Sequence, residues 1–217
     1  ANTTYHVRAY ATNTAGTAYG NEVSFTTNGI APTITTQAAS NITATTATGN
    51  GNITNLGIPN PTQYGVCWST NTSPTIAGSK TEQGAVAATG AFTSNITGLT
   101  PNTTYYVRAY ASNSAGTAYG GEISFTTDPQ APIVTTQAAS AITSDSATGN
   151  GNITSLGGPN PTAHGVCWDT TANPDTSDNH TDEGAAGATG TFTSSITGLS
   201  ANTTYHVRAY ATNTAGT

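Results

Sequence analysis

The chain repeats itself with a spacing of 100 residues, and this repeat constrains the fold more than any other feature of the sequence. Residues 201–217 match residues 1–17 at all seventeen positions. Without a gap, residues 28–117 align with residues 128–217 at 56 of 90 positions. A sequence with such a period predicts an array of equivalent structural units, each about 100 residues long.

The repeat boundaries predict three segments. Residues 1–27 match residues 101–127, so they correspond to the last two strands of a preceding repeat. Residues 28–127 form a complete repeat, and residues 128–217 form a repeat that lacks its final strand, the counterpart of 118–127. Two explanations stay open: the sequence is a window on a longer array, or its open ends are real and one chain completes the next.

The second explanation assigns a role to the segment AYGNEVSFTT at 18–27. A sandwich without an edge strand leaves unpaired backbone groups along the neighbouring strand, and these groups are a template for strand addition. The apolar residues of this assembly strand are Tyr19, Val23 and Phe25. The predicted partners are therefore neighbouring copies of the chain, which contact one another head to tail and build a filament.

Short runs of β-branched and aromatic residues predict an all-β fold. Gly, Pro or Asn interrupts these runs at intervals of 8–15 residues, and no window has helical spacing. The predicted strands of the complete repeat are 33–38, 44–54, 62–70, 90–98, 103–112 and 118–127, with a weak one near 76–83. Seven strands in about 100 residues predict tandem seven-stranded antiparallel β-sandwiches.

Charge and composition exclude two classes of partner. Four Lys and Arg against ten Asp and Glu give a net charge of −6, so cations are too few to neutralise a run of phosphates and we expect no nucleic-acid binding. No apolar run approaches the roughly 18–20 residues of a membrane-spanning helix, so we expect no membrane insertion. The abundance of β-branched residues, including 48 Thr, favours a folded chain over a disordered one.

One stretch of the complete repeat resembles a known family. The segment LTPNTTYYVRAYASNSAG at 99–116 has a Leu, then Pro-x-Thr-x-Tyr, then alternating Val and Ala, then Asn-x-x-Gly. This pattern resembles a fibronectin type III domain, and the resemblance implies that Tyr105, with Tyr5 and Tyr205, is the tyrosine corner of that family. Together with YGVCWST at 64–70, the stretch is similar to tandem repeats of large bacterial surface and secreted proteins.

The tryptophans depart from the family pattern. Trp68 and Trp168 are the only tryptophans of the chain, and each falls on the third predicted strand of its repeat. A fibronectin type III domain usually has its Trp on the second strand, whereas immunoglobulin domains have it on the third. The resemblance therefore implies a core whose arrangement is intermediate between those of the two families.

Period-two alternation assigns side chains to the two faces of a strand. The residues predicted to point inward are Tyr64, Val66, Trp68, Tyr105, Val107 and Ala109. The residues predicted to point outward are Cys67, Tyr106, Arg108 and Tyr110. We expect Tyr106, Arg108 and Tyr110 to form an outward ladder, with room above the adjoining Gly65, that serves as a lateral contact or a sugar platform. Ordinary cross-strand pairing is the alternative.

The two cysteines, Cys67 and Cys167, occupy equivalent positions in successive repeats. Sandwiches about 30 Å long, at about 3.3 Å per strand residue, hold them too far apart for a disulfide. Each is either a small buried apolar residue beside Trp or an outward thiol used for lateral crosslinks. No Cys-x-x-Cys motif supports zinc or thioredoxin chemistry.

Five acidic residues crowd one loop of the last repeat, whereas the matching loop of the complete repeat keeps only Glu82. They are Asp169, Asp175, Asp178, Asp182 and Glu183. Carboxylates this close in sequence are candidate Ca²⁺ ligands, but their spacing does not match the 12-residue EF-hand loop, and a solvated surface loop is the alternative. We therefore expect chelation to leave the stability unchanged, and we expect no cofactor.

Three function classes remain: a structural repeat of a stalk or filament, an adhesin, and an accessory module of an enzyme. Catalysis needs a base, a nucleophile and an orienting group in one pocket. Because the few ionisable groups gather in one variable loop, we expect that the protein has no enzymatic activity. The units are similar enough to replace one another, which favours the structural repeat. We expect the protein to lie at the cell surface or outside the cell. The alternative is a cell-surface adhesin that binds glycans or proteins.

Overall fold

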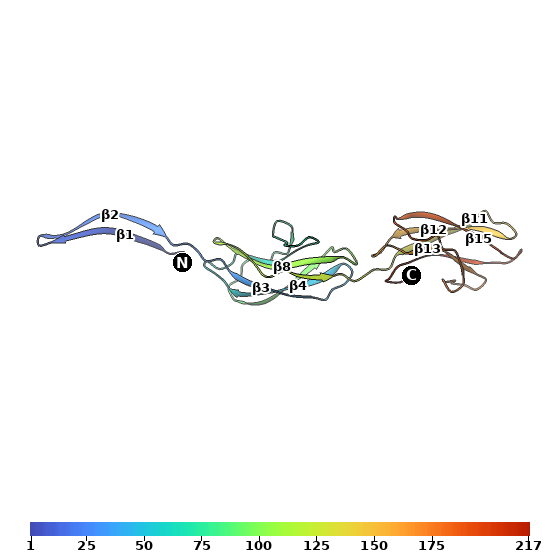
Figure 1. Ribbon diagram of the computed structural model, residues 1–217, viewed down its shortest axis with the longest axis horizontal. Coiled ribbons are helices and arrows are strands. Elements are labelled where there is room, and N and C mark those ends of the chain that lie inside the picture. Colours follow the sequence, from blue (N-terminus) through green and yellow to red (C-terminus); the bar gives the residue numbers. More distant parts are fainter. The chain divides into compact units, whose positions relative to one another are not determined.

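The computed structural model describes residues 1–217 and consists of strands, turns and loops, as Figure 1 shows. The predicted all-β class is confirmed, because no helix is present. No segment is a long apolar helix of the kind that crosses a membrane. By its contacts the chain divides into two compact units, one of residues 1–42, 46–97 and 104–126 and the other of residues 43–45, 98–103 and 127–217.

Strands β1 (Thr4–Asn13) and β2 (Gly16–Thr26) form an antiparallel hairpin. The side-chain oxygen of Asn13 accepts a hydrogen bond of 2.8 Å from the backbone N–H of Ala15, which closes the turn between the strands. Neither strand contacts any other strand of the chain. Every side chain of the hairpin strands is consequently exposed.

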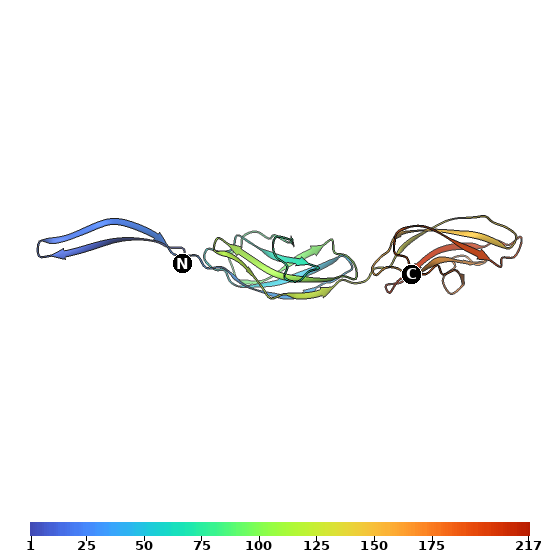
Figure 2. The same ribbon diagram turned by 45° about the horizontal axis from the view of Figure 1, so that its top comes forward.

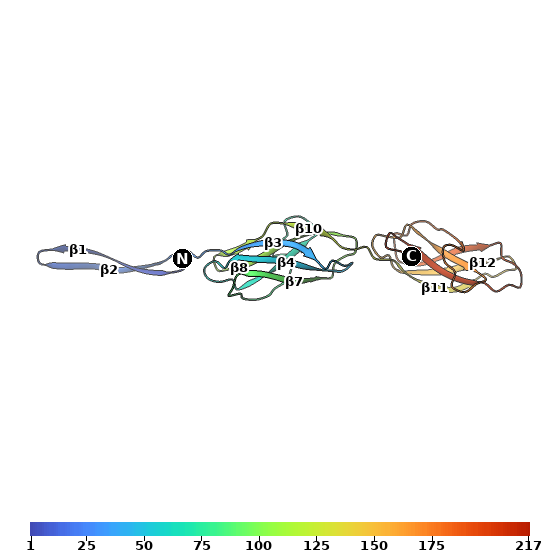
Figure 3. The same ribbon diagram turned by 90° about the horizontal axis from the view of Figure 1, so that it is seen from below.

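Residues 33–126 form a sandwich of two sheets, here called the first sandwich. One sheet has the order β3-β4-β7, as Figure 3 shows, and its strands are β3 (Thr33–Ser40), β4 (Thr46–Asn55) and β7 (Gly90–Thr97). The other has the order β10-β8-β5-β6, with β9 also paired to β8. Its strands are β5 (Gln63–Ser69), β6 (Ser79–Lys80), β8 (Thr104–Asn113), β9 (Gly116–Tyr119) and β10 (Ile123–Thr126).

The core lies between the two layers, which face each other in Figure 2. One cluster joins Ile34 and Ile53 of the first sheet to Ala109 and Ala111 of β8. Alternate residues of β8 supply this face, because side chains along a strand point to opposite sides in turn. The predicted inward direction of Val107 and Ala109 is confirmed, since both side chains are buried.

The second sandwich spans residues 133–212 and repeats this arrangement. One sheet contains β11 (Ile133–Ser140), β12 (Ser146–Ser155) and β15 (Gly190–Thr197) in that order. The other has the order β14-β13-β16, with β14 (Asn179–His180), β13 (Ala163–Asp169) and β16 (His206–Thr212). The register is retained, because Val166 lies opposite Ala209 as Val66 lies opposite Ala109.

The predicted final strand 118–127 differs from the structure, which divides it between β9 and β10. The break falls at Gly120, which lies so close to β3 that a Cβ atom there would be 2.4 Å from the backbone nitrogen of Thr36. The first sandwich therefore has eight strands rather than seven. The weak strand near 76–83 is reduced to the two residues of β6.

The prediction that Tyr110 and Cys67 point to an open outer surface is wrong, since these side chains are 1% and 0% exposed. Residues 70–88, here called the strap, lie over this face. The Tyr110 hydroxyl donates a hydrogen bond of 2.6 Å to the carbonyl of Thr81, and the Cys67 thiol lies 3.5 Å from the carbonyl of Pro74. The room above Gly65 is thus filled by the strap, which lies so close that a Cβ atom there would be 2.4 Å from the Thr81 carbonyl oxygen.

Pairs of neutral hydroxyl groups bridge neighbouring strands throughout the molecule. The hydroxyl oxygens of Thr4 and Thr26 are 2.9 Å apart in the hairpin, and those of Thr104 and Thr126 are 2.9 Å apart in the first sandwich. Further pairs are Thr33–Thr54 at 2.7 Å, Ser112–Thr117 at 2.8 Å and Thr212–Thr217 at 2.7 Å. Some of the threonines therefore serve cross-strand pairing.

Candidate functional site

Both cysteines are free and buried. Cys67 lies beneath the strap, and Cys167 lies beneath the counterpart of the strap, residues 170–188, here called the second strap. Burial raises the pKa of Cys67 from its usual value near 9.0 to about 11, although the nearby Arg108 guanidinium acts in the opposite direction. Burial likewise raises the pKa of Cys167 to about 11, and the carboxylates of Asp175 and Asp178 add to this effect. A buried, protonated thiol is a poor nucleophile, so the outward-thiol interpretation is wrong.

The structure does not bring the five candidate calcium ligands together. Asp175 accepts hydrogen bonds from the backbone N–H and the hydroxyl of Ser177, at 2.8 and 2.6 Å, and these bonds lower the pKa of Asp175. Asp178 accepts from the Asp175 N–H, Asp169 from the Thr170 N–H and Asp182 from the Gly184 N–H, at 3.0, 2.6 and 2.8 Å respectively. No group of three or more His, Cys, Asp or Glu side chains is placed to hold a metal ion, Glu183 included.

The predicted outward ladder is replaced by a clamp around Tyr119 of β9. The Arg108 guanidinium lies over the Tyr119 ring, 4.5 Å from its centroid, rather than over Tyr106 or Tyr110. The Nε atom of Arg108 donates a hydrogen bond of 3.0 Å to the carbonyl of Gly120. The Tyr119 hydroxyl in turn accepts a hydrogen bond of 3.2 Å from the backbone N–H of Ile76 in the strap. A lateral contact at Tyr106 and Arg108, both half-buried, stays a prediction.

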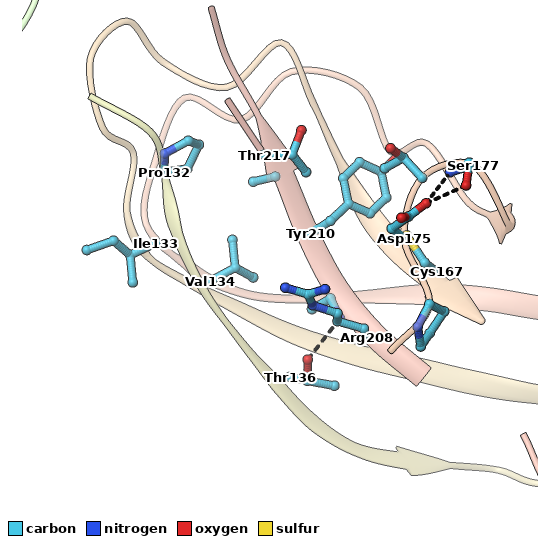
Figure 4. Close-up of a pocket in the computed structure, with 14 residues that line it drawn as sticks. Pro132, Ile133, Val134, Thr136, Cys167, Asp175, Ser177, Arg208, Tyr210 and Thr217 are labelled. Atoms are coloured by element: carbon cyan, nitrogen blue, oxygen red, sulfur yellow. Dashed lines mark hydrogen bonds between the residues drawn. The ribbon is translucent and has the colours of Figure 1, made fainter. Parts of the chain in front are cut away.

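The second sandwich has a groove of about 620 Å³ at the place that corresponds to this clamp (Figure 4). β16 carries Arg208 and Tyr210, which line one side of the groove, and Asp175 of the strap counterpart lines another. β11 lines a further part of the groove, where Val134 and Thr136 contribute side chains. Arg208 is the counterpart of Arg108, so this groove lies where an aromatic ring is clamped in the first sandwich.

A second groove, of about 400 Å³, also borders β16. Its apolar lining includes Trp168, Leu199, Tyr205 and Val207. The hydroxyl of Tyr205 accepts a hydrogen bond of 3.1 Å from the backbone N–H of Ser200, the local contact expected of a tyrosine corner. In the first sandwich the counterpart of Tyr205, Tyr105, stacks on Phe125 of β10 with ring centroids 5.9 Å apart.

The hairpin carries nearly the same residues as β8 and β10, but no core lies beneath them. Tyr105, Val107 and Phe125 are 8%, 1% and 7% exposed in the first sandwich. Their counterparts Tyr5, Val7 and Phe25 are 51%, 46% and 54% exposed. The other two residues of the predicted assembly strand, Tyr19 and Val23, are equally open to solvent.

The hairpin nevertheless holds the geometry of the complete repeat. The rings of Tyr5 and Phe25 stack with centroids 5.6 Å apart, and the Arg8 guanidinium lies 4.9 Å from the centroid of the Tyr19 ring. Arg8 Nε also donates to the carbonyl of Gly20 at 3.1 Å, as Arg108 does to Gly120. The hairpin is thus a β-ribbon with exposed apolar side chains at Tyr5, Val7, Val23 and Phe25.

The sequence predicted the hairpin residues of this candidate site but missed Arg208 and Trp168 as groove residues. The signal was present in the alignment of the repeats, because Arg208 matches Arg108 and Tyr19 matches the ring that Arg108 clamps. The grooves themselves depend on side chains from β11 and β16 that meet only in the folded sandwich.

Comparisons with known proteins do not identify a family for this chain, so the description of the fold rests on its strands. No family model matches the chain, and a search of curated proteins finds no relative. Among solved structures, the chain is similar to the crystal structure of chicken CNTN1 FN1-FN3 domains, with 13% identity over 97% of this chain and 73% of that chain and a TM-score of 0.33. A TM-score this low adds nothing to the sheet order. The two facing antiparallel sheets of each sandwich are the fold that the fibronectin type III resemblance implies.

Proposed function

We propose that the chain is a structural repeat segment of an extracellular fibre, stalk or filament, which assembles head to tail with neighbouring copies and has no catalytic role. The resemblance of its repeats to those of large bacterial surface and secreted proteins supports a location at the cell surface or outside the cell. In this proposal residues 28–127 are a complete unit, residues 1–27 match the last part of a unit, and residues 128–217 match most of another.

One observation carries the proposal: the same long-range hydrogen bonds recur at a spacing of 100 residues. The backbone N–H of Ala109 donates to the Thr36 hydroxyl at 2.9 Å, and that of Ala209 donates to the Thr136 hydroxyl at 2.9 Å. The bond from Tyr110 to the Thr81 carbonyl recurs from Tyr210 to Thr181, again at 2.6 Å. Units held by the same internal bonds can replace one another, and such units supply length rather than separate functions.

The chemistry of the ionisable groups supports a role without catalysis. The shifted pKa values leave Cys67 and Cys167 protonated and Asp175 ionised at neutral pH, and none of these is a group poised near neutrality. The carboxylates of the second strap are engaged in their own turns. The polar side chains therefore serve local structure.

Electron microscopy of negatively stained material tests the proposal on the 217-residue chain. We expect linear particles whose mean length grows with protein concentration, since the contact between copies is a reversible association. Sedimentation velocity should show the same growth as a shift toward larger species. Particles of uniform length equal to one chain at every concentration would contradict head-to-tail assembly.

The exposed aromatic rings of the hairpin favour a second candidate, an adhesin that binds surface glycans. Tyr10 and Tyr19 lie side by side, with ring centroids 6.4 Å apart and with both side chains exposed. Neighbouring exposed rings offer apolar faces on which a sugar ring can stack. A glycan array tests this function with the unaltered chain and with the Tyr10→Ala variant. An adhesin should give a signal with the unaltered chain, and the variant should lose that signal.

A further inference from the structure

The segment between β10 and β11 contains one peptide bond of unusual chemistry, which joins Asp128 to Pro129. Asp128 is the only acidic residue of the chain that proline follows. Both residues and the next one, Gln130, are exposed, so water reaches the bond. We propose that this bond is an acid-cleavage site, at which the side chain of Asp128 cuts the chain into residues 1–128 and 129–217.

The cleavage needs only the chain, acid and water. A side-chain oxygen of Asp128 forms a C–O bond to the carbonyl carbon of the same residue and gives up its proton, which closes a five-membered cyclic anhydride. The C–N bond to Pro129 then breaks, and the proline nitrogen takes a proton from the acid and leaves as the amine of a new N-terminus. Water opens the anhydride to two carboxyl groups, so the net reaction is hydrolysis of one peptide bond.

Proline at position 129 makes the nitrogen a better leaving group than that of any other residue. Its bond to Asp128 is a tertiary amide, whose nitrogen carries an additional carbon and therefore accepts a proton more readily. Proline also has no backbone N–H that could tie the bond into a hydrogen-bonded ladder. The sequence thus places a nucleophile and a leaving group on the two sides of one exposed bond.

The structure holds the carbonyl group that is attacked. The backbone N–H of Asn102 donates a hydrogen bond of 3.1 Å to the carbonyl oxygen of Asp128. The backbone N–H of Asp128 in turn donates to the carbonyl of Thr43, also at 3.1 Å. Negative charge develops on the attacked oxygen as the new C–O bond forms, and a donor already directed at that oxygen stabilises the charge. Asn102 therefore supplies an oxyanion donor, and Thr43 holds Asp128 in place.

The segments that bond to this part of the chain carry no charge of their own. Residues 43–45 and 98–103 contain the partners of Asp128, and Gly158 exchanges two backbone hydrogen bonds with Gln130 on the other side, at 2.8 and 2.9 Å. None of these segments contains a titratable residue. The carboxyl group of Asp128 is therefore the acid–base group at this bond.

The matching bond one repeat earlier joins Asn28 to Gly29. Its carbonyl oxygen has the same kind of contact, because the backbone N–H of Asn2 donates to it at 3.2 Å. However, the amide of Asn28 is not a carboxyl group, and the nitrogen of Gly29 belongs to an ordinary secondary amide. The chain thus contains two linkers with similar backbone contacts, of which only one has the reactive groups.

The sandwiches themselves do not depend on ionised groups. The buried polar residues are neutral, and they are Ser94, Thr127, Ser194 and Asn213. Only 6% of all residues are charged, and exposed ion pairs contribute little to stability. Acid should therefore cut the bond while both sandwiches are still folded, so that an array of such units would be shortened by whole units.

Incubation of the full chain in dilute formic acid tests the proposal. Mass spectrometry of the products should find the two fragments 1–128 and 129–217, and the bond between Asn28 and Gly29 should stay intact. At neutral pH the chain should stay whole. Circular dichroism in the same acid should show the β-sheet signal of the folded chain while the fragments form. Cleavage that begins after another aspartate, or no cleavage at all, would overturn the proposal.

Three variants test the roles of the two residues. Asp128→Asn removes the nucleophile, and Pro129→Ala removes the leaving group. Asp128→Glu is the matched control, since it retains a carboxyl group that can attack only through a larger and less favourable ring. Each variant should form the two fragments more slowly by roughly tenfold or more, because attack depends on the position of the carboxyl group. If Asp128→Glu is cut as fast as the original chain, the carboxyl group is not the nucleophile and the proposal is wrong.

Urea tests the contribution of the fold. In the unfolded chain the N–H of Asn102 no longer faces the carbonyl of Asp128, so cleavage in acid with urea should be several-fold slower than in acid alone. An equal or faster rate in urea would show that Asn102 does not assist the reaction. Cleavage occurs within a single chain, so these results do not depend on whether copies of the chain assemble.

Discussion

Ser94 and Ser194 occupy the same buried position in the two sandwiches but differ in their partners. The Nε2 atom of Gln83 donates hydrogen bonds to the Ser94 hydroxyl and to the Thr93 carbonyl, at 2.5 and 2.6 Å. In the second sandwich Glu183 stands in place of Gln83, and its side chain makes no hydrogen bond with Ser194. The hydroxyl of Ser194 has no hydrogen-bond partner, which costs stability because a buried polar group loses its contact with water.

Glu183→Gln should therefore stabilise the second sandwich. We expect the free energy of unfolding to rise by about 1 kcal/mol, the net value of one satisfied buried hydrogen bond. The reverse substitution, Gln83→Glu, should lower the stability of the first sandwich by a similar amount. Urea denaturation measures both changes, and an unchanged midpoint for Glu183→Gln would show that Ser194 is satisfied in another way.

The buried thiols predict a loss of stability at alkaline pH. Burial raises the pKa of Cys67 and Cys167 to about 11, and it raises that of Tyr110 to about 12. Below pH 9 the thiols are protonated in the folded and the unfolded chain, so their contribution does not change with pH. Above pH 9 the unfolded chain loses these protons first, so the free energy of unfolding falls as pH rises toward the folded values.

The expected loss is up to about 3 kcal/mol per cysteine between pH 9 and 11, at about 1.4 kcal/mol per pKa unit. Thermal unfolding followed by circular dichroism at a series of pH values measures it. The variant Cys67→Ala/Cys167→Ala should show a shallower slope over this window. Equal slopes would mean that other groups carry the alkaline transition.

At the scale of the element, the strap depends on the absence of a side chain at Gly65. A Cβ atom there would lie 2.4 Å from the backbone oxygen of Thr81, and a backbone atom cannot move aside without moving the strap. Gly65→Ala should cost about 1–3 kcal/mol, the usual cost of overpacking. It should also expose Tyr110, which ultraviolet titration would detect as a tyrosine that ionises at lower pH. Gly121→Ala is the control, since nothing lies within 4 Å of its added Cβ atom, and it should be nearly neutral.

The second strap also carries the acidic residues, and we expect it to be insensitive to chelation. Its carboxylates accept hydrogen bonds from their own turns and do not converge. The melting temperature of the chain should be the same in EDTA and in millimolar Ca²⁺. A drop of several degrees in EDTA that Ca²⁺ reverses would instead support the calcium interpretation.

The strands of the sandwich could be predicted from the sequence more completely than the segments between them. The alternation of Val107 and Ala109 with polar neighbours indicates which face of β8 is buried, because a strand has a simple period of two. The strap has no period, so nothing in its sequence indicates that it covers Tyr110 and Cys67. The break between β9 and β10 falls at Gly120, whose close neighbour Thr36 is far away in the sequence. The grooves were missed for the same reason, since their walls come from distant strands.

For the whole molecule, the two sandwiches should unfold separately. Tyr205 and Val207 of the second sandwich are only half-buried whereas their counterparts are buried, and the hydroxyl of Ser194 has no partner, so we expect the second sandwich to melt at the lower temperature. Val66 and Val166 are matched core residues, each fully buried, and truncation to Ala should cost about 2–4 kcal/mol in either sandwich. Calorimetry should show that Val166→Ala shifts only the lower transition and Val66→Ala only the upper one. A single transition that both variants shift alike would show that the sandwiches unfold as one cooperative block.

The hydroxyl pairs between strands have a consequence for the surroundings in which such a chain can work. Charged residues make up 6% of the sequence, and the ion pair of Lys80 with Glu82 lies at the surface, at 3.1 Å. Dissolved ions weaken attraction between exposed charges but leave a hydrogen bond between two neutral hydroxyls almost unaffected. The stability of the folded chain should therefore be nearly the same at high and at low salt concentration. A fibre built from such chains would keep its stability when the salinity of its surroundings changes.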